Sequence, residues 1–178
     1  MILKKNNNKI IFLILLYISL LIGFLLGENS SGGSLKDFNY TYQFILKISD
    51  NINSGINEML KINQYHFPLH YVFIGVLLKF LKKIWVVKLI FLHISLLIPF
   101  IFYQCLKFEY KNKTSIFFFS LLIFFSPYYR SSSIWPTTDN TALIFFLLST
   151  YFLLKNNYLN KLSSYLCAIF FFILGILH

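Results

Sequence analysis

Apolar runs alternate with short polar stretches along this chain, and their spacing predicts a helical membrane protein. The runs cover residues 10–26, 67–81, 84–106, 115–129, 141–154 and 162–177. A spanning helix needs about 20 apolar residues, and shorter ones cross where the bilayer is thin or distorted. We therefore predict an all-α membrane protein with about five transmembrane helices, at 10–26, 84–106, 114–129, 140–154 and 162–177, and with the site carried on external loops.

The run at 67–81 differs from the others, and we predict a helix that lies in the membrane interface. It is short, starts with a stretch that contains Pro68, and ends among Lys79, Lys82 and Lys83. Lysines at such a position extend their ammonium groups to the lipid headgroups. The helix would close an external loop over residues 27–83. Within that loop, apolar residues at helical spacing between Phe38 and Ile48 predict a short amphipathic helix, and 51–57 is interpreted as loop.

Composition and charge support the membrane class. Hydrophobic residues make up 57% of the chain and charged residues only 12%, whereas soluble domains carry about 25% charged residues. The lysines occur in short clusters between apolar runs, which is typical of cytoplasmic loops and argues against a nucleic-acid partner. A basic N-terminus followed by the long run 10–26, with a poor cleavage site after it, favours a retained first helix over a signal peptide. We expect a multi-pass protein of the bacterial inner membrane with a cytoplasmic N-terminus.

The topology depends on the segment 67–81. If it lies flat, the basic turns at 107–113 and 155–161 are cytoplasmic, and 27–81 and 130–139 are external. If it spans the membrane, the two basic turns become external. The lysine count hardly separates these topologies, and the short length of 67–81 favours the first. Because the chain ends in an apolar run, we also expect it to be the N-terminal part of a longer membrane protein, inactive by itself.

The polar segment 126–140 is the strongest candidate for chemistry. It carries Arg130 and Asp139 between two apolar runs, and lipid cannot satisfy such groups. In the favoured topology Asp37 lies near the same membrane face. Paired carboxylates can hold a divalent cation or deprotonate an acceptor hydroxyl. Asp139 is equally well explained as a helix cap, Asp37 as an ordinary loop acid, and Arg130 as a headgroup contact or a phosphate contact.

Other residues that could bind metals give weak signals. His66 and His70 flank a proline at a spacing of four, without neighbouring carboxylates. Cys105 and Cys167 both lie in apolar runs, so neither a disulfide framework nor a metal cluster can be inferred. We predict no metal site from these residues and expect His66 to face the external cavity.

The order of three short motifs resembles the C-type membrane glycosyltransferase superfamily (GT-C). The chain has Gly-Gly-Ser-Leu-Lys-Asp-Phe at 32–38, His-Phe-Pro-Leu-His-Tyr at 66–71, and Ser-Pro-Tyr-Tyr-Arg at 126–130 ahead of Asp139. The basic turn 107–113 lies between the last two, as in that superfamily. The chain departs from the pattern in two places: Phe38 stands where many members have a glutamate after the aspartate, and Asn140 follows Asp139 in place of a second acid.

The resemblance implies transfer of a sugar from a polyprenyl-phosphate-linked donor to an acceptor hydroxyl or amide at the external face. Asp37 would act as the general base, Asp139 would orient the acceptor or hold a divalent cation, and Arg130 would neutralise the leaving phosphate. His66 would line the substrate site. The partners would be membrane lipid and the donor, and the need for a cofactor stays open.

Two other classes compete with this interpretation. A transporter or flippase for a lipid-linked or anionic substrate would also have an external arginine and broken helices. The long first loop and the absence of ionisable residues in the middle of the spans argue against it. A membrane anchor without any site is favoured if Asp37 and Asp139 lie on opposite faces.

Overall fold

The computed structural model describes residues 2–61, 68–159 and 162–176, and within these ranges every regular element is a helix. In chain order they are α1 (Ile2–Leu26), α2 (Ser34–Asp50), α3 (Ile52–Lys61), α4 (Leu69–Leu81), α5 (Ile84–Ser95), α6 (Leu97–Glu109), α7 (Lys113–Leu121), the 3₁₀ helix η1 (Leu122–Phe125), α8 (Pro127–Ile134), α9 (Thr138–Leu159) and α10 (Leu162–Ile176).

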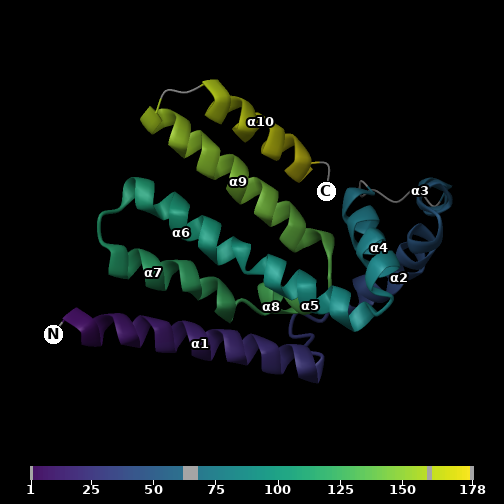
Figure 1. Cartoon of the computed structure of the whole chain (residues 1–178), viewed down its shortest axis with the longest axis horizontal. Coiled ribbons are helices and arrows are strands. Elements are labelled where there is room, and N and C mark those ends of the chain that lie inside the picture. Colours follow the sequence, from purple (N-terminus) through teal and green to yellow (C-terminus); the bar gives the residue numbers. More distant parts are fainter. Residues whose placement is uncertain (1, 62–67, 160–161, 177–178) are drawn as a thin grey trace.

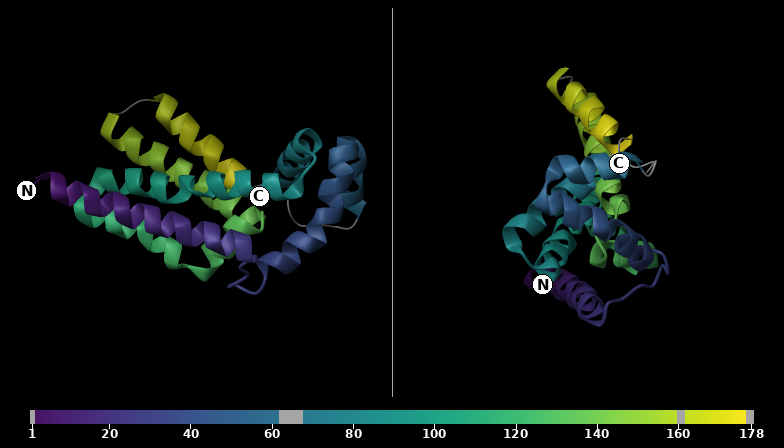
Figure 2. Two further views of the ribbon diagram at one scale, coloured as in Figure 1. Left: turned by 60° about the horizontal axis from the view of Figure 1, so that its bottom comes forward. Right: turned by 90° about the vertical axis from the view of Figure 1, so that its right-hand side faces the viewer.

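The helices form a bundle and a smaller lobe at one end of it. In the bundle α6 packs between α7 and α9, and α10 packs on α9 (Figure 1). Helices α2, α3 and α4 make the lobe, which projects beyond the bundle in the left view of Figure 2. The junction between lobe and bundle is formed by α5, α8 and the C-terminal end of α1. We call this junction end of the molecule the head.

The described helices include two that are long and apolar enough to cross a membrane, or three if a bent pair counts as one. The two are 8–26 in α1 and 84–109, which comprises α5 and α6, and the bent pair is α8 with α9. The other predicted spans correspond to shorter apolar helices, Lys113–Phe125 and Leu162–Ile176. The structure thus confirms an all-helical fold with apolar helices that suit a membrane protein, but it does not confirm five spans.

Three predictions about local structure meet different outcomes. The amphipathic helix expected after residue 34 is present as α2, with Phe38, Thr41, Ile45 and Ile48 on its buried face. The loop predicted at 51–57 is wrong, because most of it lies in α3. The span predicted at 114–129 is too long, since its helix ends at Phe125 and the next residues begin α8.

The predicted interfacial segment 67–81 is helical from residue 69 as α4, which packs on α2 through a close contact. A methyl group added to Gly75 would lie 2.6 Å from Cγ2 of Ile48 and 3.2 Å from the Ile45 carbonyl oxygen. Only glycine allows the two helices to approach this closely. The buried face of α4 is therefore committed to the lobe.

Proline explains both the break between α5 and α6 and the attachment of α8 to it. Pro99 has no N–H, so the carbonyl of Ser95 four residues earlier lacks its usual helical donor. The hydroxyl of Tyr129 donates to that oxygen over 3.1 Å. Because Tyr129 is buried on α8, this bond fixes α8 against the middle of the 84–109 helix.

Candidate functional site

Helix α8 crosses the head and carries much of the polar segment that the sequence singled out. Ser126 caps the helix by accepting from the Tyr129 N–H, and Pro127 occupies its first turn. The chain then bends by 110° into α9. The segment expected to be an external loop is therefore helical up to Ile134, and Arg130 lies on a helix. The pairing of Ser126 with Pro127 is a helix-start signal that could have predicted this.

Hydrogen bonds between serines join the turn after α1 to α8. The Ser131 hydroxyl lies 3.1 Å from the Ser30 hydroxyl and accepts from the Ser31 N–H over 3.0 Å. The hydroxyls of Ser34 and Ser132 lie 3.3 Å apart. Both Ser131 and Ser132 are fully buried, and buried hydroxyls need such partners. The first and second polar segments therefore converge, as the favoured arrangement required.

Arg130 is paired with Glu28, a partner that the sequence gave no reason to choose. Its Nε donates to Oε1 over 2.7 Å and its Nη2 to Oε2 over 2.5 Å, a bidentate arrangement. The guanidinium also donates to the Ser19 hydroxyl and carbonyl oxygens. Arg130 holds the pKa of Glu28 below its ordinary value, and burial opposes that shift.

The end of α1 explains how Glu28 reaches this position. Gly27 adopts a left-handed conformation with φ of 66°, and the Glu28 N–H donates back to the Gly23 carbonyl over 2.8 Å. This is the Schellman ending, which folds the chain over the last helical turn. A methyl group at Gly23 would lie 2.2 Å from Glu28 Oε2. A larger residue at position 23 would displace the Glu28 carboxylate from its present place against α1.

Asn140 anchors the bend between α8 and α9 from inside. It is 2% exposed, and its amide donates to the Ser133 hydroxyl over 2.9 Å and to the Ser95 hydroxyl over 3.3 Å. His70 of α4 reaches the same bend, with Nδ1 2.9 Å from the Thr141 hydroxyl and Nε2 3.3 Å from the Pro136 carbonyl. Asn140 stands where the GT-C pattern has a second acid, and in this structure its side chain holds the bend in place.

Asp37 and Asp139 each lie in the first turn of a helix that begins at the head. Asp37 lies in the first turn of α2 and is exposed, and Asp139 lies in the first turn of α9 and is partly buried. Burial raises the pKa of the Tyr71 phenol to about 12, and the negative charges of Asp139 and Asp37 add to the rise. Tyr128 lies in the first turn of α8, two residues before Arg130. We call Asp37 and Asp139 the acidic pair.

The acidic pair and Arg130 belong to different parts of the head. The charge partner of Arg130 is Glu28, against α1, whereas the acidic pair lies on α2 and α9. His66, the fourth predicted site residue, lies outside the described residues. Within the described residues, no group of three His, Cys, Asp or Glu could hold a metal ion. A cation held by this part of the chain would have only the acidic pair and neutral oxygens as ligands.

Lys88 is a head residue to which the sequence assigned no role. It begins the second turn of α5, and its Nζ lies 3.3 Å from the centroid of the Trp135 ring. The rings of Phe24 and Phe38 are at 5.9 and 5.8 Å. Trp135 is held in place because its indole N–H donates to the Glu28 carbonyl over 3.0 Å. Residues from α1, α2 and the α8–α9 bend thus surround one ammonium group.

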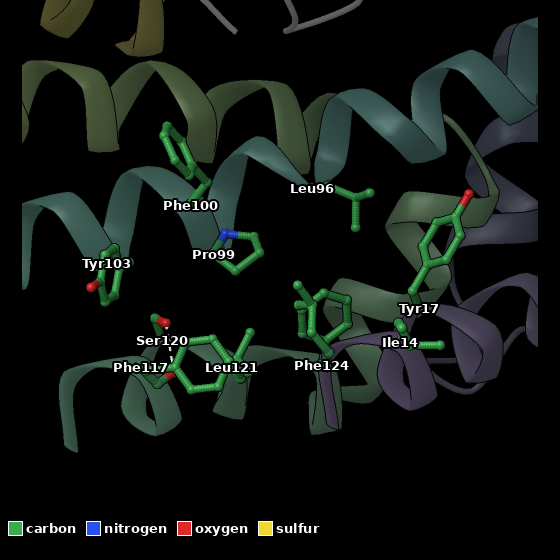
Figure 3. A pocket seen from close by; sticks show the side chains of 11 residues that line it. Ile14, Tyr17, Leu96, Pro99, Phe100, Tyr103, Phe117, Ser120, Leu121 and Phe124 are labelled. Carbon is green, nitrogen blue, oxygen red and sulfur yellow. Dashed lines mark hydrogen bonds between the residues drawn. The ribbon is translucent and has the colours of Figure 1, made fainter. Parts of the chain in front are cut away.

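An apolar groove of about 560 Å³ opens between α1, α6, α7 and η1 (Figure 3). Its walls include Tyr17 of α1, Pro99 and Tyr103 of α6, and Phe117 and Phe124 beyond the 107–113 turn. At its edge the Tyr17 hydroxyl lies 2.7 Å from Nε2 of His93, which links α1 to α5. A groove of this composition suits a hydrocarbon chain, and we call it the bundle groove.

Comparison with known proteins identifies no relative of this chain. No family model, curated protein or solved structure matches it. The resemblance to the GT-C superfamily therefore rests on the sequence motifs alone.

Proposed function

We propose that this chain forms the catalytic head and lipid-binding groove of a membrane glycosyltransferase. The enzyme would move a sugar from a polyprenyl-phosphate-linked donor to an acceptor at the external face of the membrane. The observation that supports the proposal is that the starts of α2 and α9, which carry Asp37 and Asp139 in their first turns, both meet α8 at the head: the hydroxyls of Ser34 on α2 and Ser132 on α8 lie 3.3 Å apart, and α9 follows α8 directly. The negative charges of both carboxylates also raise the pKa of the Tyr71 phenol, so we treat them as one candidate site.

The division of labour follows from exposure and position. Asp37 is exposed on the first turn of α2, where it can reach an acceptor from solvent and accept its proton as general base. Asp139 is partly buried in the first turn of α9 and is suited to orienting the acceptor or to holding a divalent cation. The bundle groove would hold part of the polyprenyl chain. Arg130 would contact phosphate only if the phosphate displaced the Glu28 carboxylate, because the guanidinium already donates two hydrogen bonds to Glu28.

A transfer assay in proteoliposomes tests this proposal. Proteoliposomes would receive polyprenyl-phosphate-linked mannose, glucose or arabinose together with a membrane extract as acceptor, and release of polyprenyl phosphate would be measured by mass spectrometry. Loss of a general base lowers turnover by about 10²- to 10⁴-fold, so we expect Asp37→Asn to fall by at least about 100-fold. Asp139→Asn would also fall.

A matched control is available on the same helix. Asp50 is exposed at the opposite end of α2, so Asp50→Asn removes a similar charge away from the head and should retain wild-type turnover. Transfer by Asp37→Asn at the wild-type rate would refute the general-base assignment. Absence of release from all three donors by the wild-type protein would refute the transferase proposal.

The bent pair of α8 and α9 favours a second candidate, a flippase or transporter for a lipid-linked substrate. Discontinuous helices of this kind position substrate sites in transporters, and the 110° bend occurs where Arg130 and Asp139 lie. The same proteoliposomes distinguish the two functions. A flippase would make the donor accessible on the opposite leaflet without breaking the sugar–phosphate bond.

A further inference from the structure

Among the described residues, Lys88 is a partly buried cation of the head that has no carboxylate partner. Arg130 and Glu28 neutralise each other through two hydrogen bonds. Lys88 is partly buried, and it forms no ion pair with a carboxylate of the described residues. Its described neighbours are the rings of Trp135, Phe38 and Phe24. The ammonium is therefore held by aromatic faces alone among the described contacts.

Aromatic faces compensate only part of the cost of burying a charge. A cation over an indole gains about 2 kcal/mol when desolvated, whereas the effective penalty for removing an ion from water is several kcal/mol. An anion that approached Lys88 would gain the interaction that no described carboxylate provides. Since lysine presents a compact point charge and not a planar fork, it suits a tetrahedral phosphate at any orientation.

We propose that Lys88 is the phosphate contact of this protein and that it binds the headgroup of an anionic polyprenyl-phosphate lipid. The assignment deepens the proposed function and rests on it for the identity of the donor. Lys88 lies on α5, the helix that links the lobe to the bundle, and next to Phe38, the residue that follows Asp37. The aromatic rings keep the ammonium in place in the absence of ligand.

This position also defines what Lys88 would do during transfer. The bond between the anomeric carbon and the phosphate oxygen breaks, and its electron pair stays on that oxygen, so the phosphate gains one negative charge. The acceptor oxygen bonds to the anomeric carbon and its proton passes to Asp37. A fixed ammonium beside the phosphate stabilises the charge that develops there.

Trp135 supplies a direct optical probe of this contact. The chain has two tryptophans, so in a Trp85→Phe variant the emission of Trp135 reports on the ring that Lys88 covers. Farnesyl phosphate would be titrated into the purified chain in detergent, with farnesol as the neutral analogue and inorganic phosphate as the soluble anion. Farnesyl phosphate should change the emission as the ammonium turns toward it, and farnesol should not.

Variants separate the charge of Lys88 from its packing. We expect Lys88→Met to weaken farnesyl phosphate binding by at least about tenfold, while Lys88→Arg retains most of it. Lys79→Met is the matched control, because Lys79 is exposed on α4 and should bind as the parent does. The retained charge in Lys88→Arg keeps the test valid if the methionine variant does not fold.

Each outcome bears on the proposal. Competition by inorganic phosphate would show that the anion itself is recognised, and binding of farnesyl phosphate without such competition would show that the lipid chain is also needed; both support a phosphate contact at Lys88. Equal binding by Lys88→Met, or an equal response to farnesol, overturns it. Because no sugar is involved, farnesyl phosphate binding without glycosyl transfer would keep this subsite and reject only the transferase.

Discussion

The Glu28–Arg130 pair should make a measurable contribution to stability, and a double-mutant cycle can isolate it. The single variants are Glu28→Gln and Arg130→Gln, which keep the approximate shape of each side chain. These side chains are 22% and 16% exposed, so the pair is neither a surface pair nor a fully buried one. Surface pairs contribute about 0–1 kcal/mol, and loss of one partner from a buried pair costs about 3–5 kcal/mol.

The expected magnitude lies between these limits. Each single variant should lose about 2 kcal/mol, which for a chain of this size lowers the melting temperature by about 4–8 °C. The double variant should lose little more than either single variant, so the coupling energy should be about 1–2 kcal/mol. Unfolding would be followed by circular dichroism in detergent at neutral pH and low salt.

The lobe provides a control pair with the same charges. Lys47 and Glu58 form an ion pair between α2 and α3 whose side chains are 48% and 35% exposed. The cycle with Lys47→Gln and Glu58→Gln should give a coupling of less than about 1 kcal/mol. Additive losses at Glu28 and Arg130 would refute the argument. An Arg130→Gln variant with full stability and impaired farnesyl phosphate binding would make Arg130 the free phosphate contact instead of Lys88.

Two further predictions follow from the head. Arg130 keeps the pKa of Glu28 below its ordinary value of 4.5, so the pair stabilises the fold fully above about pH 4.5 and loses this contribution as the pH falls through the lowered pKa. Melting temperatures of the parent protein, measured from pH 7 to pH 3, should show this loss. In Glu28→Gln this pH-dependent component should be absent. The second prediction concerns labelling with a membrane-impermeant maleimide in a background without Cys105 and Cys167. Lys36→Cys and Tyr128→Cys should react from one side of the membrane and Asn112→Cys from the other, because α2 and α8 begin at the head and α7 begins at the far end of the bundle. Labelling of Lys36→Cys and Tyr128→Cys from opposite sides would refute a shared site for the acidic pair.

The local sequence pattern was enough to predict a helix that buries an apolar stripe on one face. The spacing of Phe38 and Ile48 predicted α2 because its buried stripe repeats at the helical period. The prediction failed for α3, where polar residues at 51–57 were taken for loop; the helix buries only Gly55 and Met59 and so carries almost no apolar pattern. The polar and charged residues around Arg130 favoured an external loop, whereas the structure has the helix α8 there; Ser126 and Pro127 are the signal for its start.

The candidate site could be predicted only as far as residue type allowed. Asp37 and Asp139 were identifiable because carboxylates are scarce in an apolar chain, and the favoured topology predicts that they lie near the same membrane face. Arg130 was identified as a charged group, but its partner is 102 positions away and no spacing rule relates the two. Lys88 was passed over because it lies near the end of an apolar run, where a lysine is usually explained by contact with headgroups. Its surroundings consist of three rings that come from separate elements, and no local sequence pattern predicts them.

The polar contacts of the head have a second consequence, because they also hold α1. Only 17% of the apolar window of α1 is buried, so packing alone gives this helix little attachment to the rest of the chain. Leu16 and Leu20 pack into the core, and hydrogen bonds add further links: Lys9 donates to Thr114 at one end, Tyr17 meets His93 in the middle, and Ser19 and Glu28 bind Arg130 at the head. In a membrane, where apolar surfaces gain little by leaving lipid, such bonds are an important source of helix association. Removal of the Arg130 side chain would therefore free the head end of α1, which carries Phe24 beside Lys88. The middle of the same helix forms one wall of the bundle groove. The ion pair thus serves the proposed site by keeping α1 in place, while Lys88 remains available for the ligand.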